Sequence, residues 1–335
     1  MRIAVLAVLL ALGACGDAGD STAAPKAAPP HVAPPAREGP ELSFPLDCTI
    51  GAGCEVQQYP DHDPGPDYRD YAGGRQSYDG HGGTDIRIAD MAAQRAGVAV
   101  LAAAPGRVMR LRDGVPDVSI RAADATTTTG RECGNGVVID HGGGWETQYC
   151  HLAQGSLTVR PGESVVAGQP IARVGLSGAT EFAHLELDVR HAGVSVDPFA
   201  PASGGPLWSD KARAAMAYKP GAVLNAGFAA QPVTLQQVED GSVAPPTADS
   251  PALIAYVRAI GLKAGDEIEI ALKSPDGGVL AQDRSKPLDR DKAQQLVFVG
   301  KRRPAAGWPT GAYRGEYRVF RAGKVALTRS FDIRI

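Results

Sequence analysis

A histidine and a carboxylate lie four residues apart in one glycine-containing stretch. Residues 81–85 read HGGTD, in which His81 supplies an imidazole and Asp85 a carboxylate. Another histidine, His151, lies near the end of the run TQYCHL (147–152). Zinc accepts imidazole nitrogen and carboxylate oxygen, which are the donor types present here. Each signal alone is weak, because a single histidine on a strand is more often a surface or hydrogen-bonded core residue.

A further segment places two more candidate residues on one face of a predicted strand. Residues 183–189 read AHLELDV, in which apolar residues occupy every second position. Side chains of a strand point alternately to its two faces, so His184 and Glu186 project together, opposite the apolar residues. Asp188 shares this face one pleat further on, and we expect it to be a solvated or hydrogen-bonded carboxylate. Catalytic zinc sites use three protein ligands and a water, a number that these segments can supply.

The elements that must position these residues are predicted as short strands joined by tight turns. The run VVI (137–139) leads into three consecutive glycines at 142–144, and residues 147–152 return from them as the second strand of a hairpin. Between 159 and 178, glycine-containing turns alternate with short apolar strands. No stretch of helical period occurs from 45 to 205, so this region is predicted to be one all-β domain.

The C-terminal third is predicted as a second β domain. A connector over 206–235 contains a short helix that begins after Ser209 and ends before Pro220. Residues 236–335 consist of short alternating strands separated by turns, which indicates an immunoglobulin-like β-sandwich. This part of the sequence contains no evident group of metal ligands and no nucleophile–base pair, so binding of a partner protein or of cell wall, or stabilisation of the fold, are the roles expected for it.

The first residues have the pattern of an export signal. The apolar run 3–12 is too short to span a bilayer, and it ends in LGAC (12–15), which resembles the bacterial lipobox. We therefore expect a lipoprotein signal peptide over 1–14, lipidation of Cys15 and an Ala/Pro-rich tether over 15–44. The expected location is the cell envelope, facing the periplasm, with either the inner or the outer membrane holding the anchor. A plain signal peptide cut near Ala14 is the alternative.

Four cysteines remain after Cys15. In an oxidising compartment an even number favours disulfides over zinc–thiolate binding, and four cysteines allow three pairings. We predict Cys48 with Cys54 and Cys133 with Cys150, because the glycine hairpin would bring the second pair face to face. Free buried thiols are the alternative.

The net charge of the chain excludes few functions, but it argues against nucleic acid as a partner. The formal net charge is −3, with 44% hydrophobic and 21% charged residues, which is ordinary for a soluble globular protein. No nucleic-acid partner is expected from this balance.

Several of these segments together resemble lysostaphin-type (LytM-like) endopeptidases. The run DGHGGTDI (79–86) is similar to the metal-binding motif of that family. The runs VIDHG (138–142), YCHL (149–152) and VVAGQ (165–169) are similar to its later landmarks. The resemblance covers roughly residues 75 to 200 and implies a LytM-like β-sheet fold with one zinc ion.

Carried over by position, the resemblance assigns roles to the candidate residues. His81 and Asp85 would be zinc ligands, and His151 and His184 would be catalytic histidines outside the ligand set. The last family motif is His-x-His, and this sequence has Glu186 in place of the second histidine. Glutamate is able to preserve the ligand count. The centre would then be neutral instead of +1, which should make the bound water less acidic.

The expected function is that of a zinc metalloendopeptidase that hydrolyses peptide bonds of peptidoglycan, with the cell wall as partner. The alternative from the same family is a degenerate, non-catalytic regulator that activates a separate cell-wall amidase, since loss of a ligand is typical of such proteins. A lipoyl-like carrier over 161–178 is disfavoured, because no lysine lies at a hairpin tip there.

Overall fold

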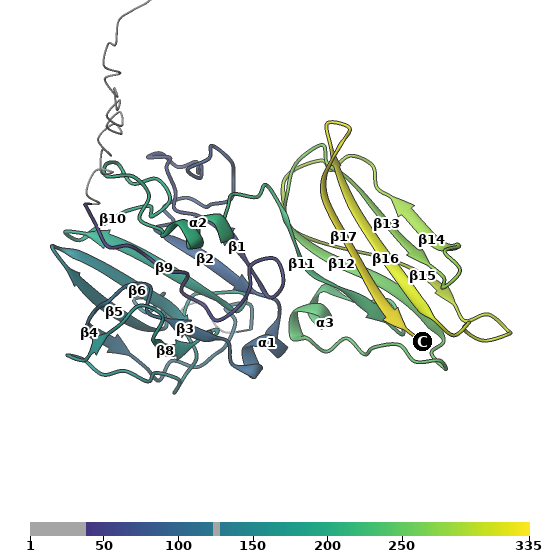
Figure 1. Ribbon diagram of the computed structural model, residues 1–335, viewed down its shortest axis with the longest axis horizontal. Coiled ribbons are helices and arrows are strands. Elements are labelled where there is room, and N and C mark those ends of the chain that lie inside the picture. The colour runs from purple at the N-terminus through teal and green to yellow at the C-terminus, as the bar shows by residue number, and fades with distance from the viewer. Residues whose placement is uncertain (1–37, 123–127) are drawn as a thin grey trace, which may run out of the picture. The chain divides into compact units, whose positions relative to one another are not determined.

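The computed structural model describes residues 38–122 and 128–335 (Figure 1). The expected signal peptide, Cys15 and residues 15–37 of the expected tether lie outside this part of the chain. Among the described residues, no helix is both long enough and apolar enough to cross a membrane.

The N-terminal domain is built on one eight-stranded sheet. Its strands follow the order β1-β2-β9-β6-β5-β4-β7, and β10 pairs with β9. The strands are β1 (Cys54–Gln58), β2 (Gly83–Ile88), β4 (Gly106–Arg112), β5 (Asn135–Gly142), β6 (Trp145–Leu152), β7 (Ser164–Val165), β9 (His184–His191) and β10 (Val194–Ser195). A smaller sheet pairs β3 (Ala99–Leu101) with β8 (Pro170–Arg173).

The two faces of strand β9 differ as the alternating sequence predicts. Leu185, Leu187 and Val189 are fully buried in the main hydrophobic core, together with residues of β2, β5 and β6. The side chains between them point to the other face of the sheet. This polar face, directed away from the core, is where the candidate ligands gather.

Both predicted disulfides are present in the structure. Cys48 is bonded to Cys54 and Cys133 is bonded to Cys150. The hairpin predicted around the three glycines is the β5–β6 pair, and its second strand carries Cys150 beside His151. In addition, the backbone N–H of His151 donates to the carbonyl of Cys133. The second disulfide therefore fixes the backbone next to a candidate catalytic residue.

The C-terminal domain is a sandwich of two antiparallel sheets, so the all-β fold is confirmed. One sheet has the order β11-β12-β15 and the other has the order β14-β13-β16-β17. The strands are β11 (Ala222–Ala229), β12 (Ala252–Leu262), β13 (Glu267–Lys273), β14 (Val279–Arg284), β15 (Lys292–Arg302), β16 (Ala312–Arg321) and β17 (Lys324–Arg334). A separate core of buried residues, including Val257, Leu272 and Tyr317, lies between the two sheets. Strand β11 falls inside the range 206–235 that the sequence indicated as a connector.

Three six-residue helices complete the described chain: α1 (Met91–Ala96), α2 (Asp210–Ala215) and α3 (Leu235–Asp240). Helix α2 is the one predicted from the sequence, and the Ser209 side chain caps it. Helices α1 and α3 were not predicted, because a helix of under two turns shows no measurable period. Local signals for both exist: Asp90 caps α1, and Thr234 with Gln237 forms a capping box on α3.

Candidate metal centre

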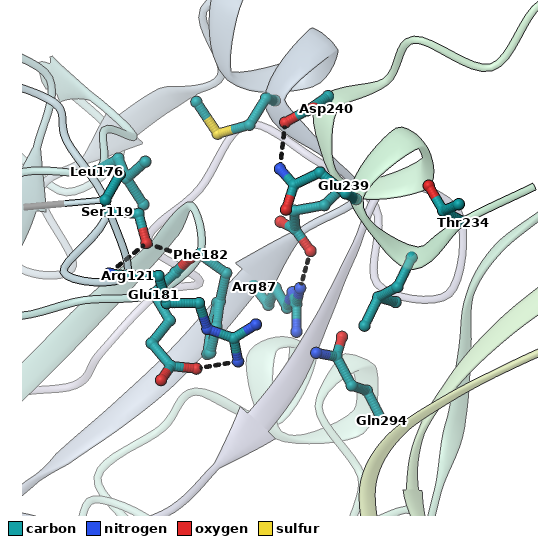
Figure 2. A pocket seen from close by; sticks show the side chains of 14 residues that line it. Arg87, Ser119, Arg121, Leu176, Glu181, Phe182, Thr234, Glu239, Asp240 and Gln294 are labelled. Carbon is teal, nitrogen blue, oxygen red and sulfur yellow. Dashed lines mark hydrogen bonds and ion pairs between the residues drawn. The ribbon is translucent and has the colours of Figure 1, made fainter.

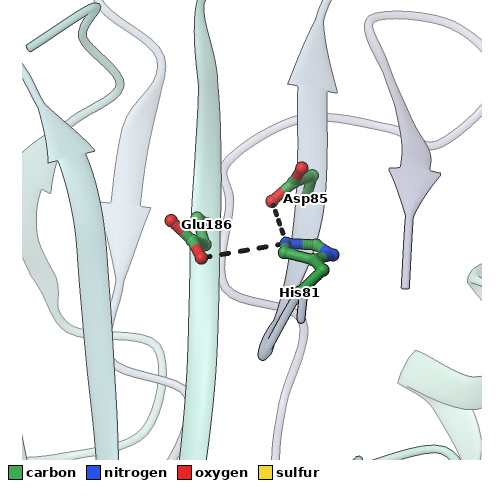
Figure 3. Close-up of side chains that lie close together, drawn as sticks. All are labelled: His81, Asp85 and Glu186. Atoms are coloured by element: carbon green, nitrogen blue, oxygen red, sulfur yellow. Dashed lines mark hydrogen bonds and ion pairs between the residues drawn. The ribbon is translucent and has the colours of Figure 1, made fainter. Parts of the chain in front are cut away.

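Strand pairing brings two carboxylates face to face. Strands β2 and β9 are antiparallel neighbours, and Asp85 is directly opposite Glu186 in their register. His81 precedes β2, and its Nε2 lies 3.1 Å from Asp85 Oδ1 and 3.8 Å from Glu186 Oε1 (Figure 3). Donor atoms of these three residues all lie within 4.8 Å of one another. The structure thus places the three proposed ligands in one cluster.

Glycine at position 83 makes room for this arrangement. A Cβ atom at Gly83 would lie 2.6 Å from Asp188 Oδ1 and 2.8 Å from Glu186 Cγ. Contacts under 3.0 Å are essentially never made by real Cβ atoms. The second glycine of the HGGTD stretch therefore allows the two carboxylate side chains of β9 to approach β2.

Three histidines are oriented by the same kind of hydrogen bond, from Nδ1 to a backbone carbonyl. The Nδ1 atom of His81 lies 2.9 Å from the carbonyl oxygen of Tyr59, and that of His151 lies 2.8 Å from the carbonyl of Ser177. The Nδ1 atom of His184 lies 2.9 Å from the carbonyl of Phe182. A carbonyl only accepts, so each Nδ1 carries the proton and each Nε2 is turned toward the cluster. Such carbonyl partners fix the tautomer and the ring orientation of metal-site histidines.

The two proposed catalytic histidines lie side by side next to the ligands. The rings of His151 and His184 have centroids 4.6 Å apart. His184 Nε2 is 3.6 Å from Asp85 Oδ1, and His151 Nε2 is 3.0 Å from Glu186 Oε2. His151 has a positive φ of 61°, an unusual conformation for a non-glycine residue that this end of β6 maintains.

The ligand set fits zinc on three grounds. Ligand atoms about 2.0–2.2 Å from a tetrahedral zinc lie roughly 3.3–3.6 Å from one another, and the His81 contacts to the carboxylates fall on either side of that range. The donors are one imidazole nitrogen and two carboxylate oxygens, which zinc accepts. In addition, His81 already donates its Nδ1 proton to a backbone carbonyl, as a zinc-bound histidine almost always does through its second ring nitrogen.

Electrostatics at the centre are dominated by the carboxylates. Burial lowers the pKa of His81, but Asp85 and Glu186 outweigh burial and raise this pKa to about 9. Burial raises the pKa of Asp85, but His81 and His184 outweigh it and hold this pKa well below its usual range. In Asp188, burial and the neighbouring Glu186 charge raise the pKa to about 6. The cluster thus attracts positive charge strongly, either as protons on histidine or as a cation.

Glu186 has a second contact that sequence reasoning did not reveal. One carboxylate oxygen faces His81 and the other faces His151. Burial lowers the pKa of His151, but its hydrogen bond to Glu186 and the charge of that residue outweigh burial and raise the pKa. A histidine at position 186 has only one free ring nitrogen to offer a metal and no second acceptor atom for His151. Glutamate therefore links the ligand cluster to a proposed catalytic residue.

Tyr78 is another site residue that the sequence did not single out. Its ring stacks on His81 with centroids 4.3 Å apart, while 45% of the residue remains exposed. The tyrosine therefore lies at the surface beside the cluster. No motif marks it beyond its place three residues before His81.

The remaining histidines of the described chain have partners of their own outside the cluster. His62 pairs with Asp197, and His191 stacks on Trp145. His141 lies 2.7 Å from the carbonyl of Pro105 and 2.8 Å from the Thr147 hydroxyl. These contacts account for the three side chains as structural residues.

The sheet, its polar face and the histidine–carboxylate cluster form a domain with a candidate metal site. Residues 79–198 match the model of peptidase family M23, a family whose peptidases are zinc-dependent. This confirms the resemblance to lysostaphin-type enzymes seen in the sequence.

Solved structures with similarity to the chain include the catalytic domain of an M23 protein and two peptidases. A point mutant of the catalytic domain of the M23 protein EnpA, encoded by a prophage of Enterococcus faecalis, is 20% identical, with 49% of this chain and 97% of that chain covered and a TM-score of 0.33. A zinc-containing peptidase from Vibrio cholerae is 24% identical, with 43% and 39% covered and a TM-score of 0.28. The catalytic domain of lysostaphin from Staphylococcus simulans is 19% identical, with 42% and 86% covered and a TM-score of 0.28. No curated protein matches the chain.

Proposed function

We propose that this chain is a zinc metalloendopeptidase that hydrolyses peptide bonds of bacterial peptidoglycan. The observation that carries the proposal is the cluster of His81, Asp85 and Glu186, whose donor atoms lie within 4.8 Å of one another, flanked by two further histidines. A structural cluster would not need three buried imidazoles all turned inward by backbone carbonyls. The family of residues 79–198 supports zinc as the metal.

The chain's own residues divide the work of amide hydrolysis. His81, Asp85 and Glu186 would hold a zinc ion, which would supply Lewis-acid chemistry at this cluster. His151 and His184 present Nε2 to the same space, so they are placed to hold or pass a proton between water and the leaving amine. The hydrogen bond to Glu186 raises the pKa of His151, so this residue is placed to donate a proton to a developing oxyanion.

One observation favours the alternative, a non-catalytic regulator of a cell-wall amidase. The hydrogen bond between His151 and Glu186 ties a proposed ligand to a proposed catalytic residue. In a protein without bound metal, this bond would still hold Glu186 and His151 together. The two functions therefore differ in whether Glu186 binds zinc.

The proposed location of the protein rests on its N-terminal segment. A lipid on Cys15 and the Ala/Pro-rich tether would hold the peptidase at the cell envelope, within reach of the wall. Cys15→Ser is expected to move the protein from the membrane fraction to the soluble fraction. A mutant that stays in the membrane fraction contradicts lipid anchoring through Cys15.

The central experiment compares three residues at position 186. Glu186→Ala should lower zinc affinity by more than about 100-fold, since a ligand is lost and even loss of a group that only orients a ligand costs 10- to 100-fold. Glu186→His should bind zinc at least as well as wild type and should hydrolyse cell wall faster near neutral pH, because a positive centre makes the bound water more acidic. Zinc content is measured by metal analysis, and hydrolysis by release of soluble peptides from purified peptidoglycan.

Glu146→Ala is the matched control, because Glu146 is a partly buried carboxylate on neighbouring strand β6 outside the cluster. It should leave zinc content and hydrolysis unchanged. Equal zinc in wild type and Glu186→Ala would show that Glu186 is no ligand. If wild type holds no zinc and cuts nothing while Glu186→His does both, the regulator replaces the peptidase as the function of this chain.

A further inference from the structure

The polar face of the sheet continues past the metal centre toward the C-terminal domain. Arg87 follows Asp85 on the same face of β2 and is directly opposite His184 in the register. Its guanidinium lies 4.0 Å from the centre of the Phe182 ring, and that ring has its centroid 4.9 Å from the ring of His184. Phe182 therefore forms a wall shared by the proposed catalytic histidine and the region around Arg87.

A carboxylate of the C-terminal domain forms an ion pair with Arg87 of the N-terminal domain. Glu239, near the end of α3, accepts hydrogen bonds from both Arg87 and Arg258 of β12. Arg87 and Arg258 are 1% and 0% exposed. Arg258 also donates to the carbonyl of Ala89, just after β2. These contacts join the C-terminal domain to the edge of the proposed peptidase site.

A pocket of about 680 Å³ opens at this junction, and Figure 2 shows the side chains around it. Small-molecule pockets typically measure about 300–1,000 Å³, so a short peptide segment would fit. The N-terminal domain contributes Phe182, Leu176 and the ion pair of Arg121 with Glu181. The C-terminal domain contributes Gln294, along with residues of α3. The lining thus mixes apolar contacts with charges of both signs.

Two buried polar atoms in the lining lack a hydrogen-bond partner within residues 38–122 and 128–335. They are Oε1 of Gln294 and Nε of Arg87. Buried polar atoms are nearly always paired, so an unpaired carbonyl oxygen at a pocket wall indicates a place for a ligand N–H. Arg121 pairs through one terminal nitrogen with Glu181, and its side chain is 59% exposed. Its guanidinium carries further N–H groups that can bind a carboxylate.

We propose that this pocket binds the part of a peptide substrate that extends past His184, with Gln294 accepting a backbone N–H and Arg121 pairing with a carboxylate of that peptide. The ligand class is an extended acidic peptide, and the C-terminal domain is thereby part of the substrate-binding surface. This inference rests on the proposed peptidase function. It explains why a domain without metal ligands among its described residues would be held against the catalytic one.

The test measures binding of a soluble stem peptide of peptidoglycan, with free or with amidated carboxyl groups, by isothermal titration calorimetry. The zinc-loaded full chain is used, and all proteins carry His151→Ala so that turnover does not consume the peptide. Arg121→Gln and Gln294→Leu should each weaken binding of the free acid about five- to tenfold. Amidation should weaken binding to the parent protein by a similar factor and have little further effect in Arg121→Gln.

Matched controls are available for both substitutions. Arg213 is similarly exposed, at 55%, and is paired with one carboxylate, Asp210, on α2 outside the pocket. Gln295 follows Gln294 on β15 and points to the opposite side of the sheet. Arg213→Gln and Gln295→Leu should bind the peptide as the parent does.

The outcomes separate this inference from the proposed function, because hydrolysis is measured independently with histidine restored at position 151. If the protein cuts peptidoglycan but the two pocket variants bind like their controls, the pocket inference is overturned and the peptidase function stands. If binding depends on Arg121 and Gln294 while nothing is cut, the peptide site stands and the peptidase function fails. Equal affinity for free and amidated peptide would also overturn the assignment of Arg121.

Discussion

Two buried charged clusters contain neighbouring residues on the same face of β2 but have opposite balances of positive and negative charge. Asp85 lies in a cluster with Glu186 and histidines, where carboxylates attract a cation. Two residues on, Arg87 lies in a cluster where two buried arginines share one carboxylate, Glu239. In the first cluster, potential ligand atoms point toward a common centre. In the second cluster, the charged groups pair with one another across the two domains. The comparison shows that burial of charge alone does not mark a candidate metal site; convergence of potential ligand atoms on one point does.

The largest effect should come from breaking the arginine cluster. Glu239→Ala leaves two buried guanidinium groups without their carboxylate, and removal of one partner from a buried ion pair typically costs about 3–5 kcal/mol. We therefore expect the free energy of unfolding, measured by urea denaturation, to fall by about that amount. Zinc content should not change, because no ligand is touched.

Glu267→Ala is the control for this prediction. Glu267 pairs with Arg284 on the surface of the C-terminal domain, with 37% of its side chain exposed. An exposed pair contributes roughly 0–1 kcal/mol, so its loss should be small. Similar losses in the two variants would mean that the interdomain cluster is no more stabilising than a surface ion pair.

A smaller effect should appear at the carboxylate cluster when metal is removed. The pKa of His81 is raised from 6.5 to about 9, so the folded state holds its proton more tightly than the unfolded chain does. In the presence of a chelator, this contribution is fully present below pH 6.5 and is lost as pH rises through 9. The loss amounts to roughly 3–4 kcal/mol, since the shift is about 2.5 pKa units and one unit corresponds to ~1.4 kcal/mol.

Chemical denaturation at a series of pH values checks this prediction, with His81→Gln as the control that should lose the dependence. Zinc should bind more tightly as pH rises over the same range, because His81 must release its proton to become a ligand. A metal-free protein whose stability is flat from pH 6.5 to 9 would show that His81 is not held protonated by the carboxylates.

Much of the metal centre was predictable because its signals are local. A period of two placed His184 and Glu186 on one face, and the structure shows both on the face opposite the core. The glycine hairpin placed Cys133 near Cys150, and they are bonded. The roles of His81 and Asp85 came from the family resemblance, since a spacing of four within a turn does not by itself specify a metal site.

The arginine cluster and the pocket beside it were not predictable from the same kind of signal. Arg87 and Glu239 are 152 residues apart in sequence, and neither lies in a motif. Their contact depends on how α3 packs against β2, which no local pattern encodes. The contact of Glu186 with both His81 and His151 was not predicted either. It depends on the register of β6 against β9, in which Cys150 is opposite Glu186.

The close approach at Gly83 links two positions in the evolution of this chain. Space that a methyl group would occupy at residue 83 is filled by the side chains of Glu186 and Asp188 from the facing strand. A larger residue at 83 therefore requires the side chains at both 186 and 188 to be smaller or to point in another direction. Substitutions at positions 83 and 186 should therefore be correlated among related sequences. The residue at position 83 would then help to indicate which third ligand a sequence has at position 186.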